Sequence, residues 1–240
     1  MKYKNIIWDL DGTLLDTLQD LADATNYALR TNDMEERTLE EIRQFVGNGV
    51  RNLIIRAVPQ GEDNPSFETV FQTFKEYYIH HCQDSTKLYP GIKDTLQTLK
   101  ERGIRMAIVS NKLQRGVTEL YDFWFKDYID VAVGEREGVA RKPAPDMVRI
   151  AMEELGIENI SIFDGDKNMN EKDCDNNCEK STSFSSDTVY IGDSDVDIAT
   201  ARNSHLPCIS VLWGFRDRDF LINHGATTFI STPQEILNYV

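Results

Sequence analysis

The sequence of 240 residues lacks several features that would place it in a specialised class of protein. It has no stretch that approaches the roughly 18 consecutive apolar residues of a membrane-spanning helix. Its N-terminus runs into a predicted strand without the apolar region of a signal peptide. The four cysteines, Cys82, Cys174, Cys178 and Cys208, are scattered without the pattern of a disulfide framework. These absences predict a cytoplasmic protein with reduced cysteines and no membrane contact.

Positive charge is also scarce, because 26 lysines and arginines stand against 40 acidic residues and give a formal net charge of -14. Proteins bind nucleic acid by neutralising its phosphates with clustered Lys and Arg, so nucleic acid is not an expected partner. The same charge repels a small phosphorylated ligand. A site for such a ligand therefore needs local positive charge from a basic side chain or a metal ion. No feature of the sequence sets an oligomeric state.

What the sequence does contain is enough apolar residues, 40%, for one large α/β domain with a smaller insert. Short apolar runs typical of buried strands alternate with segments of helical periodicity. The predicted strands cover residues 5–8, 105–109, 131–133, 188–191, 208–212 and 228–230, and the predicted helices cover 92–102, 114–121, 146–155 and 196–203. This alternation predicts a doubly wound, Rossmann-like parallel sheet.

Two segments interrupt this alternation. Residues 18–83 have helical periodicity throughout, so we expect an inserted helical cap, with the α/β core formed by residues 1–17 and 84–240. Residues 161–187 are acidic, rich in Asn and Ser, and poor in apolar side chains. This composition predicts a flexible insertion within the core.

Two groups of carboxylates follow predicted strands. In the segment DLDGTLLDT, Asp9 and Asp11 lie two residues apart, so in an extended chain their side chains point the same way. In GDSDVD, Asp193 and Asp197 lie four residues apart and are expected on one face of the helix that begins there. Clustered carboxylates are costly without a cation, and Mg²⁺ is the natural occupant of an all-oxygen site. The sequence therefore predicts a magnesium site at these four acids.

Other residues offer contacts for a phosphate. The segment VSNK ends a predicted strand with Ser110 and Asn111, and RKPAPD places Lys142 before a helix. A hydroxyl, backbone N–H groups and an ammonium group can neutralise phosphoryl oxygens as charge builds during transfer. Gly12 and Thr13, in the turn after the first acids, are further candidates for contact with the substrate. Together the four segments predict one site for phosphoryl transfer.

The ordered set DxDGT, SN, KP and GDSxxD resembles the haloacid dehalogenase superfamily. The spacing, and a cap inserted after the first motif, are most similar to its phosphoglycolate phosphatase-like branch. The resemblance covers nearly the whole chain apart from residues 161–187. It implies a Mg²⁺-dependent phosphohydrolase that acts on a small phosphorylated metabolite, a phosphomonoester, through an aspartyl-phosphate.

The resemblance also implies roles for individual residues. Asp9 would be the nucleophile and Asp11 the general acid and base, while Ser110 and Lys142 would bind the transferring phosphoryl group. The implied Mg²⁺ ligands are Asp9, the backbone carbonyl of Asp11 and Asp193, with Asp197 in support.

Within the superfamily the residues distinguish between reactions. Asp11 argues against a dehalogenase or a phosphonatase, which depart from the pattern at this position. A sugar phosphomutase of the β-phosphoglucomutase type stays open, since it shares the fold and the Asp pair, although Thr13 resembles the phosphatases more than the mutases with their usual DGV. A non-catalytic phospholigand-binding protein is a third hypothesis. The substrate stays open among phosphoglycolate, other small phosphomonoesters, nucleoside monophosphates and pyrophosphate.

Two features of the predicted cap bear on how it packs and what it binds. In VGNGVRNLI, Arg51 is a candidate contact for an anionic leaving group, because the resembled family selects its substrate with the cap. A solvated helix arginine is the alternative. An aromatic stripe has the spacing of a core face: Phe67, Phe71, Phe74 and Tyr78.

Overall fold

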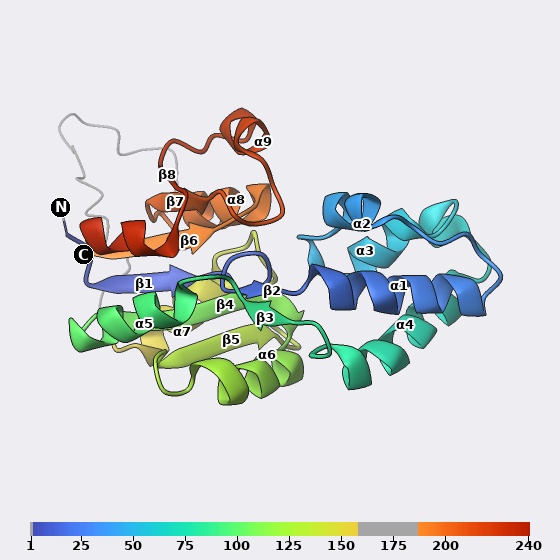
Figure 1. The fold of residues 1–240 in the computed structure, drawn as a ribbon, viewed down its shortest axis with the longest axis horizontal. Coiled ribbons are helices and arrows are strands. Elements are labelled where there is room, and N and C mark those ends of the chain that lie inside the picture. Colours follow the sequence, from blue (N-terminus) through green and yellow to red (C-terminus); the bar gives the residue numbers. More distant parts are fainter. Residues whose placement is uncertain (1, 158–186) are drawn as a thin grey trace, which may run out of the picture.

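The computed structural model describes residues 2–157 and 187–240. Over these residues the chain forms an α/β core and a helical cap that are joined by a short ribbon (Figure 1). Apart from its last residue, the predicted insertion at 161–187 lies outside the described residues, so its flexibility stays a prediction. Among the helices that are described, none combines the length and the apolar character needed to cross a membrane.

The core is built on a sheet whose six described strands are all parallel, in the order β5-β4-β1-β6-β7-β8. These strands are β1 (Asn5–Trp8), β4 (Arg105–Leu113), β5 (Val131–Glu135), β6 (Thr188–Gly192), β7 (Cys208–Val211) and β8 (Phe229–Ile230). Strand β1 lies between β4 and β6, and its Trp8 is paired with Ile108 of β4 and with Ile191 of β6. The predicted doubly wound sheet is confirmed.

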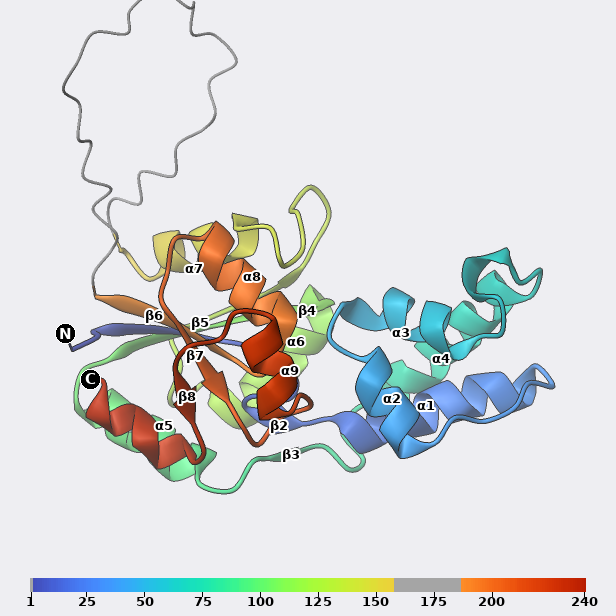
Figure 2. The ribbon, with the colours of Figure 1, turned by 90° about the horizontal axis from the view of Figure 1, so that it is seen from above.

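Helices cover both faces of this sheet. The described core helices are α5 (Ile92–Glu101), α6 (Gln114–Leu120), the π-helical turn η2 (Tyr121–Phe125), α7 (Asp146–Glu154), α8 (Asp195–Asn203), α9 (Arg218–Asn223) and the 3-10 helix η3 (Pro233–Asn238). Ile6 and Trp8 pack with α5, α6 and η3, whereas Ile7 packs with α7 and α8. Figure 2 shows α7 and α8 on one side of the strands and α5 on the other. Because both faces are covered, β1 is apolar at every position.

Two boundaries differ from prediction in ways that matter for the site. Strand β4 continues past its predicted end at Val109 to Leu113, because pairing with β5 resumes there after a register shift. Asp193 precedes α8, whose N-cap is Ser194, so the prediction that Asp193 and Asp197 share a helix face is wrong. A capping box between Ser194 and Asp197 starts the helix one residue after the cap. The loop conformation still directs Asp193 toward Asp197.

The cap consists of α1 (Leu18–Thr31), α2 (Leu39–Phe45), α3 (Gly49–Ala57), the 3-10 turn η1 (Gly61–Asp63) and α4 (Phe67–His81). Its helices share an apolar cluster of their own, in which Phe67, Phe74 and Tyr78 are buried and Phe71 lies at the edge. The predicted packing role of the aromatic stripe is confirmed. Both connections between cap and core run through the antiparallel ribbon of β2 (Leu15–Asp16) and β3 (Lys87–Leu88).

Candidate active site

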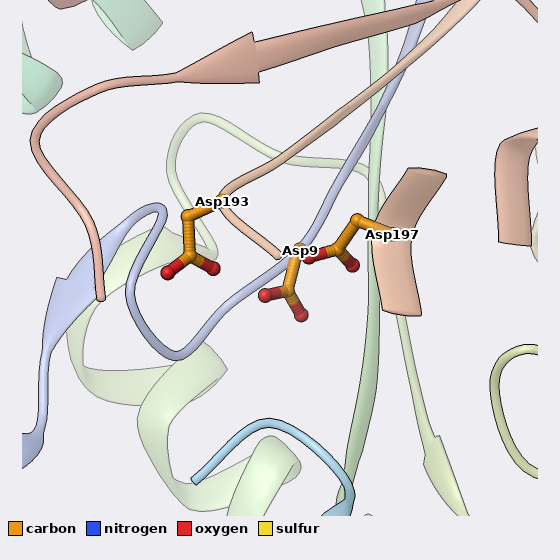
Figure 3. A group of neighbouring side chains, drawn as sticks. All are labelled: Asp9, Asp193 and Asp197. Atoms are coloured by element: carbon orange, nitrogen blue, oxygen red, sulfur yellow. The ribbon is translucent and has the colours of Figure 1, made fainter. Parts of the chain in front are cut away.

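Three buried carboxylates meet at the carboxyl ends of neighbouring strands. Asp9 follows β1, Asp193 follows β6, and Asp197 lies in the first turn of α8, and Figure 3 shows Asp9 between the other two, with the Asp197 carboxyl group directed toward it. One oxygen of each carboxylate lies within 4.8 Å of the other two. The pairing of β1 with β6 thus brings together acids that are distant in the sequence.

Burial and repulsion perturb two of these acids. Burial, followed by the charge of Asp197, raises the pKa of Asp9 well above its usual value, and Lys142 only partly opposes this shift. Burial and Asp197 also raise the pKa of Asp193 to about 7, although the N–H of Phe215 acts in the opposite direction. A cluster of this kind stays fully ionised only when a cation shares its charge. Its buried carboxylate oxygens therefore fit a hard cation such as Mg²⁺.

Lys142 is a cation that the chain itself places in this cluster. Its Nζ lies 2.6 Å from Asp9 Oδ1, 2.9 Å from Asp197 Oδ1 and 3.1 Å from the hydroxyl oxygen of Tyr190. Burial would lower the pKa of Lys142, but the charges of Asp197 and Asp9 outweigh burial and raise it. The ammonium group therefore stays charged and holds the Asp9 and Asp197 carboxylates in place.

Asp197 is fixed by four donors. Its Oδ1 accepts hydrogen bonds from Lys142 and from the hydroxyl of Tyr190, and its Oδ2 accepts from the backbone N–H and the hydroxyl of Ser194. These four hydrogen bonds match the lone pairs that a carboxylate offers. The contacts therefore suit Asp197 to the support of Lys142 more than to direct metal ligation.

Asp193 is held by the turn after β1 and by a loop after β7. Its Oδ2 accepts the backbone N–H of Phe215 at 2.6 Å, and its Oδ1 lies 3.4 Å from the Thr13 hydroxyl. Gly12 has a φ of +90°, and a Cβ there would lie 2.4 Å from Asp193 Oδ2, so only glycine allows this approach. Gly12 and Thr13, predicted as substrate contacts, thus pack against Asp193 and are not among the described residues that line the pocket.

The carboxylates open into a pocket of about 570 Å³, a volume that includes the solvent at its mouth. Apart from Phe215 its core wall is polar and charged, and it includes the predicted residues Asp9, Asp11, Ser110, Asn111, Lys142 and Asp193. Its cap wall is apolar or glycine: Leu21, Val46, Gly47, Gly49, Val50 and Leu53. The predicted phosphate contacts and acids therefore face one cavity beneath the cap.

Ser110 and Asn111 border this cavity from the end of β4. The Ser110 hydroxyl donates to Asp11 Oδ2 at 3.4 Å. Asn111 Nδ2 donates to the backbone carbonyl of Lys142 at 3.1 Å, while its Oδ1 is buried without a hydrogen-bond partner among the described residues. An unpaired buried oxygen is unfavourable, so Asn111 has acceptor capacity for a ligand.

Lys112 is the charged residue among the described pocket residues that the sequence analysis missed. Its Nζ lies 3.3 Å from Asp11 Oδ1 and 2.6 Å from the hydroxyl oxygen of Tyr78 on cap helix α4. Burial would lower the pKa of Lys112, but Asp11 and Tyr78 outweigh this effect and raise it, while burial raises the pKa of Tyr78 to about 12. The sequence did contain a signal for it. Lys112 follows Ser110 by two residues in a buried strand, so the two side chains point to the same side.

Arg51 is not among the described residues of the pocket wall. Its guanidinium group pairs with Glu62 at 3.0 Å and Glu68 at 2.6 Å, and it lies over the rings of Phe67 and Phe71. This placement agrees with the alternative of a solvated helix arginine. The geometry gives Arg51 no contact with the site.

Acids at the carboxyl edge of a doubly wound sheet, beneath a helical cap and beside a buried lysine, define a hydrolase of the haloacid dehalogenase type. Residues 6–175 match the family model described as haloacid dehalogenase-like hydrolase, and residues 139–236 match a related model of HAD-like hydrolases. The first match spans more than half of the chain. The chain belongs to the haloacid dehalogenase-like hydrolase family, which confirms the resemblance seen in its motifs.

Individual relatives narrow this assignment to a branch. The chain is 27% identical over 239 residues to a phosphoglycolate phosphatase of Pseudomonas fluorescens, covering 97% of this chain and 75% of that protein. It is 29% identical over 211 residues to one of Aquifex aeolicus, covering 88% and 85% of the two chains. A crystal structure from Lactobacillus delbrueckii subsp. bulgaricus, provisionally assigned as a phosphoglycolate phosphatase, has a TM-score of 0.83 and 35% identity over 98% of this chain and 97% of its own. These similarities confirm the phosphoglycolate phosphatase-like branch and the class of phosphoric monoester hydrolases.

Proposed function

We propose that this chain is a Mg²⁺-dependent phosphohydrolase that cleaves a small phosphomonoester of the phosphoglycolate type through an aspartyl-phosphate on Asp9. The observation that carries the proposal is the position of Asp9, buried beside Asp193 and Asp197 and hydrogen-bonded to Lys142. The relatives named phosphoglycolate phosphatase support the class of substrate.

Asp9 is the proposed nucleophile. Because Lys142 contacts Oδ1 at 2.6 Å, we assign Oδ2 to the attack on phosphorus. The new bond from this oxygen to phosphorus replaces the bond to the leaving alcohol, and a covalent aspartyl-phosphate results. Water then attacks the same phosphorus, which releases inorganic phosphate and restores the Asp9 carboxylate.

Asp11 is the proposed general acid and base. It lines the pocket two residues after the nucleophile, and its side chain keeps 23% of its surface exposed, so it can exchange protons with a bound ester. In the first step it gives a proton to the departing oxygen, and in the second it takes one from water. We assign the Ser110 hydroxyl to a phosphoryl oxygen, and the Lys142 ammonium, which lines the same pocket, to neutralising the phosphoryl charge.

Asp9 and Asp193 are the side chains that we assign to Mg²⁺, together with the backbone carbonyl of Asp11. Burial and mutual repulsion raise the pKa values of both carboxyl groups, and a bound cation would offset this cost of ionising them. Asp197 lies in the same cluster but already accepts four hydrogen bonds. We therefore assign it the role of orienting Lys142. A bound Mg²⁺ would screen the repulsion between these carboxylates and the incoming phosphate.

The proposal also includes the cellular setting. A small phosphorylated metabolite is the expected partner, since a net charge of -14 is unfavourable for binding nucleic acid. Cys82 and Cys208 are free thiols, which suits a reducing cytoplasm. Fractionation of cells that express the chain, with the thiols titrated in each fraction, checks this part.

A hydrolysis screen tests the proposed activity. A panel of phosphate esters is incubated with the protein with and without Mg²⁺, and free phosphate is measured. We expect Mg²⁺-dependent release that Asp9→Asn abolishes and that Asp195→Asn, a change in α8 outside the carboxylate cluster, leaves intact. Transfer of phosphate to a second sugar phosphate would identify a mutase, and binding without turnover would identify a phospholigand-binding protein. Either result would overturn the proposal.

A further inference from the structure

The pocket contains two buried lysines, and the proposed chemistry uses only one of them. Lys142 contacts three acceptors, on Asp9, Asp197 and Tyr190, and these match the three N–H groups of an ammonium. Lys112 contacts two described acceptors, on Asp11 and Tyr78. The contact with Asp11, at 3.3 Å, is longer than the roughly 2.7–2.9 Å of a strong charge-assisted hydrogen bond. Lys112 is therefore the pocket cation with capacity left for a ligand.

We infer that Lys112 is a specificity-determining residue that binds a carboxylate on the leaving group of the substrate. This inference rests on the proposed function and adds the residue that would distinguish an anionic leaving group from a neutral one. Nothing in the proposed phosphoryl transfer requires a second lysine, so its presence needs a separate explanation.

The position of Lys112 indicates which part of the substrate it meets. Lys142 contacts the nucleophile Asp9, whereas Lys112 contacts Asp11, the acid assigned to the departing oxygen. An ester that Asp9 attacks at phosphorus, and whose departing oxygen Asp11 protonates, therefore has its leaving group on the Lys112 side of the pocket. A charged atom beyond the departing oxygen would find the Lys112 ammonium there.

Among the described residues that line the cap side of the pocket, none is charged. These residues are Leu21, Val46, Gly47, Gly49, Val50 and Leu53. The chain as a whole is strongly acidic. An anionic leaving group would be repelled there unless Lys112 neutralised it. One remaining N–H and one positive charge suit a carboxylate better than a second phosphate dianion.

The cap contributes to this anion site in two ways. The Tyr78 hydroxyl comes from the cap and orients the Lys112 ammonium at 2.6 Å, so a seated cap completes the site. Helix α3 begins at Gly49, and Gly49 and Val50 line the pocket. The Asn48 side chain makes no capping hydrogen bond, so the first N–H groups of α3 lack that partner. The positive end of the helix adds to the attraction for an anion.

The test compares two esters that differ in one group. Phosphoglycolate carries a carboxylate, and hydroxyethyl phosphate has the same alkyl skeleton with a neutral hydroxymethyl group in its place. The measured quantity is the ratio of their kcat/KM values. We expect wild-type protein to prefer phosphoglycolate by at least about tenfold, because a site built for a charged group rejects the analogue that lacks it.

Substitution of the lysine should remove this preference. In Lys112→Met the ratio should fall at least about tenfold, to near one, mainly through KM for phosphoglycolate, because a charge-assisted contact is lost. Lys112→Arg should restore part of the ratio, and Tyr78→Phe should lower it about fivefold, since the ring is kept and only the orienting hydroxyl is removed. Lys93→Met, at an exposed position on α5, is the matched control and should keep the wild-type ratio.

Three outcomes would overturn the inference, and each is distinguishable from failure of the proposed function. Equal losses on both esters in Lys112→Met would mean that Lys112 acts on Asp11 or on the fold. A wild-type protein that hydrolyses both esters equally well would refute the carboxylate site without any variant. A lower ratio in the Lys93→Met control would show that surface charge alone sets the preference. No hydrolysis of either ester by wild-type protein would instead refute the proposed phosphohydrolase.

Discussion

The core wall and the cap wall of the pocket differ in what they contribute. On the core wall the charged side chains are locked by hydrogen bonds, as with Lys142 and its three acceptors, one of which is Asp197 with four donors of its own. The cap wall has apolar side chains and glycines. This difference indicates that the core fixes the geometry of the reaction, while the cap shapes the space for the leaving group.

A loop after β7 connects the two walls. Its Phe215 donates a backbone N–H to Asp193 and packs its ring into the apolar cluster of the cap. Arg216 donates to the backbone carbonyls of Arg43, Gln44 and Val46 at 2.6, 3.3 and 2.8 Å, at the end of α2. The same loop that positions a core carboxylate therefore also holds the cap in place.

The largest expected effect is on the core wall. Asp9→Asn removes the attacking oxygen while nearly preserving side-chain volume, so kcat should fall at least about 10⁴-fold. Steady-state kinetics with phosphate detection measure the loss, and circular dichroism checks that the variant is folded. If the variant kept a tenth of wild-type turnover in a preparation free of contaminating phosphatase, Asp9 would not be the nucleophile.

The next effect comes from removal of the metal. Chelator should lower turnover at least about 100-fold, because the buried carboxylates and the phosphate then repel one another without screening. Mg²⁺ should restore activity, and Ca²⁺ should inhibit, since its larger and looser coordination misplaces the reacting groups. Metal binding is followed separately as a rise in melting temperature, which Asp193→Asn should abolish. Unchanged turnover in chelator would refute the proposed metal site.

The connection between the walls should have a smaller effect. Arg216→Ala removes three hydrogen bonds to the cap and should raise KM about tenfold, because the cap is then held less firmly over the pocket. Arg216→Lys should recover part of the loss. Arg218→Ala, a change two residues further on in α9, is the control and should leave KM unchanged. An effect of similar size in both alanine variants would show that the loss of charge, and not the cap contact, matters.

The cap wall itself should change selectivity more than rate. Val50→Ala enlarges the cap side of the pocket, so the ratio of kcat/KM for a bulky ester to that for a small one should rise about tenfold, the effect of one or two methylene groups. Arg51→Ala lies next in sequence but outside the pocket, and it should change this ratio less than twofold by the same reasoning. A uniform loss on every ester in Val50→Ala would argue against a selective role for the cap.

The same contrast explains how much the sequence could predict. The sheet and the acids at its edge could be predicted because each strand is a short apolar run and an acid directly follows the run, as Asp9 follows β1. The cap was accessible as a region because its helical periodicity is continuous. The two-residue strands β2 and β3 were missed because they are too short to have a period, and α9 and η3 were missed because they are short and carry little periodicity.

Residues whose roles depend on distant partners were harder to predict. Lys112 gains its place from Tyr78 in the cap, and Phe215 gains its place from Asp193, so neither is evident from neighbours in the sequence. Arg51 also depends on distant partners, because Glu62 and Glu68 hold it against the surface of the cap, which agrees with the alternative of a solvated helix arginine. Local pattern indicates which groups are present, and only the fold decides which of them meet.

The smallest expected effect is a pH dependence of stability that distinguishes the buried Asp193 from the less buried Asp195. Without metal, burial and the charge of Asp197 raise the pKa of Asp193 from 3.8 to about 7. Between these values the folded chain binds a proton that the unfolded chain does not, so Asp193 stabilises the fold at low pH and this contribution is lost as pH rises through about 7. In chelator, the melting temperature of wild-type protein relative to Asp193→Asn should therefore fall by at least about 3 °C between pH 5 and pH 8, the shift that a change of about 1 kcal/mol produces in a domain of this size. Asp195→Asn is the matched comparison and should run parallel to wild type over this range. Scanning calorimetry in chelator measures these melting temperatures. Parallel curves for wild type and Asp193→Asn would mean that Asp193 is ionised in the folded chain without a cation. The raised pKa of Asp193 would then no longer support a metal site.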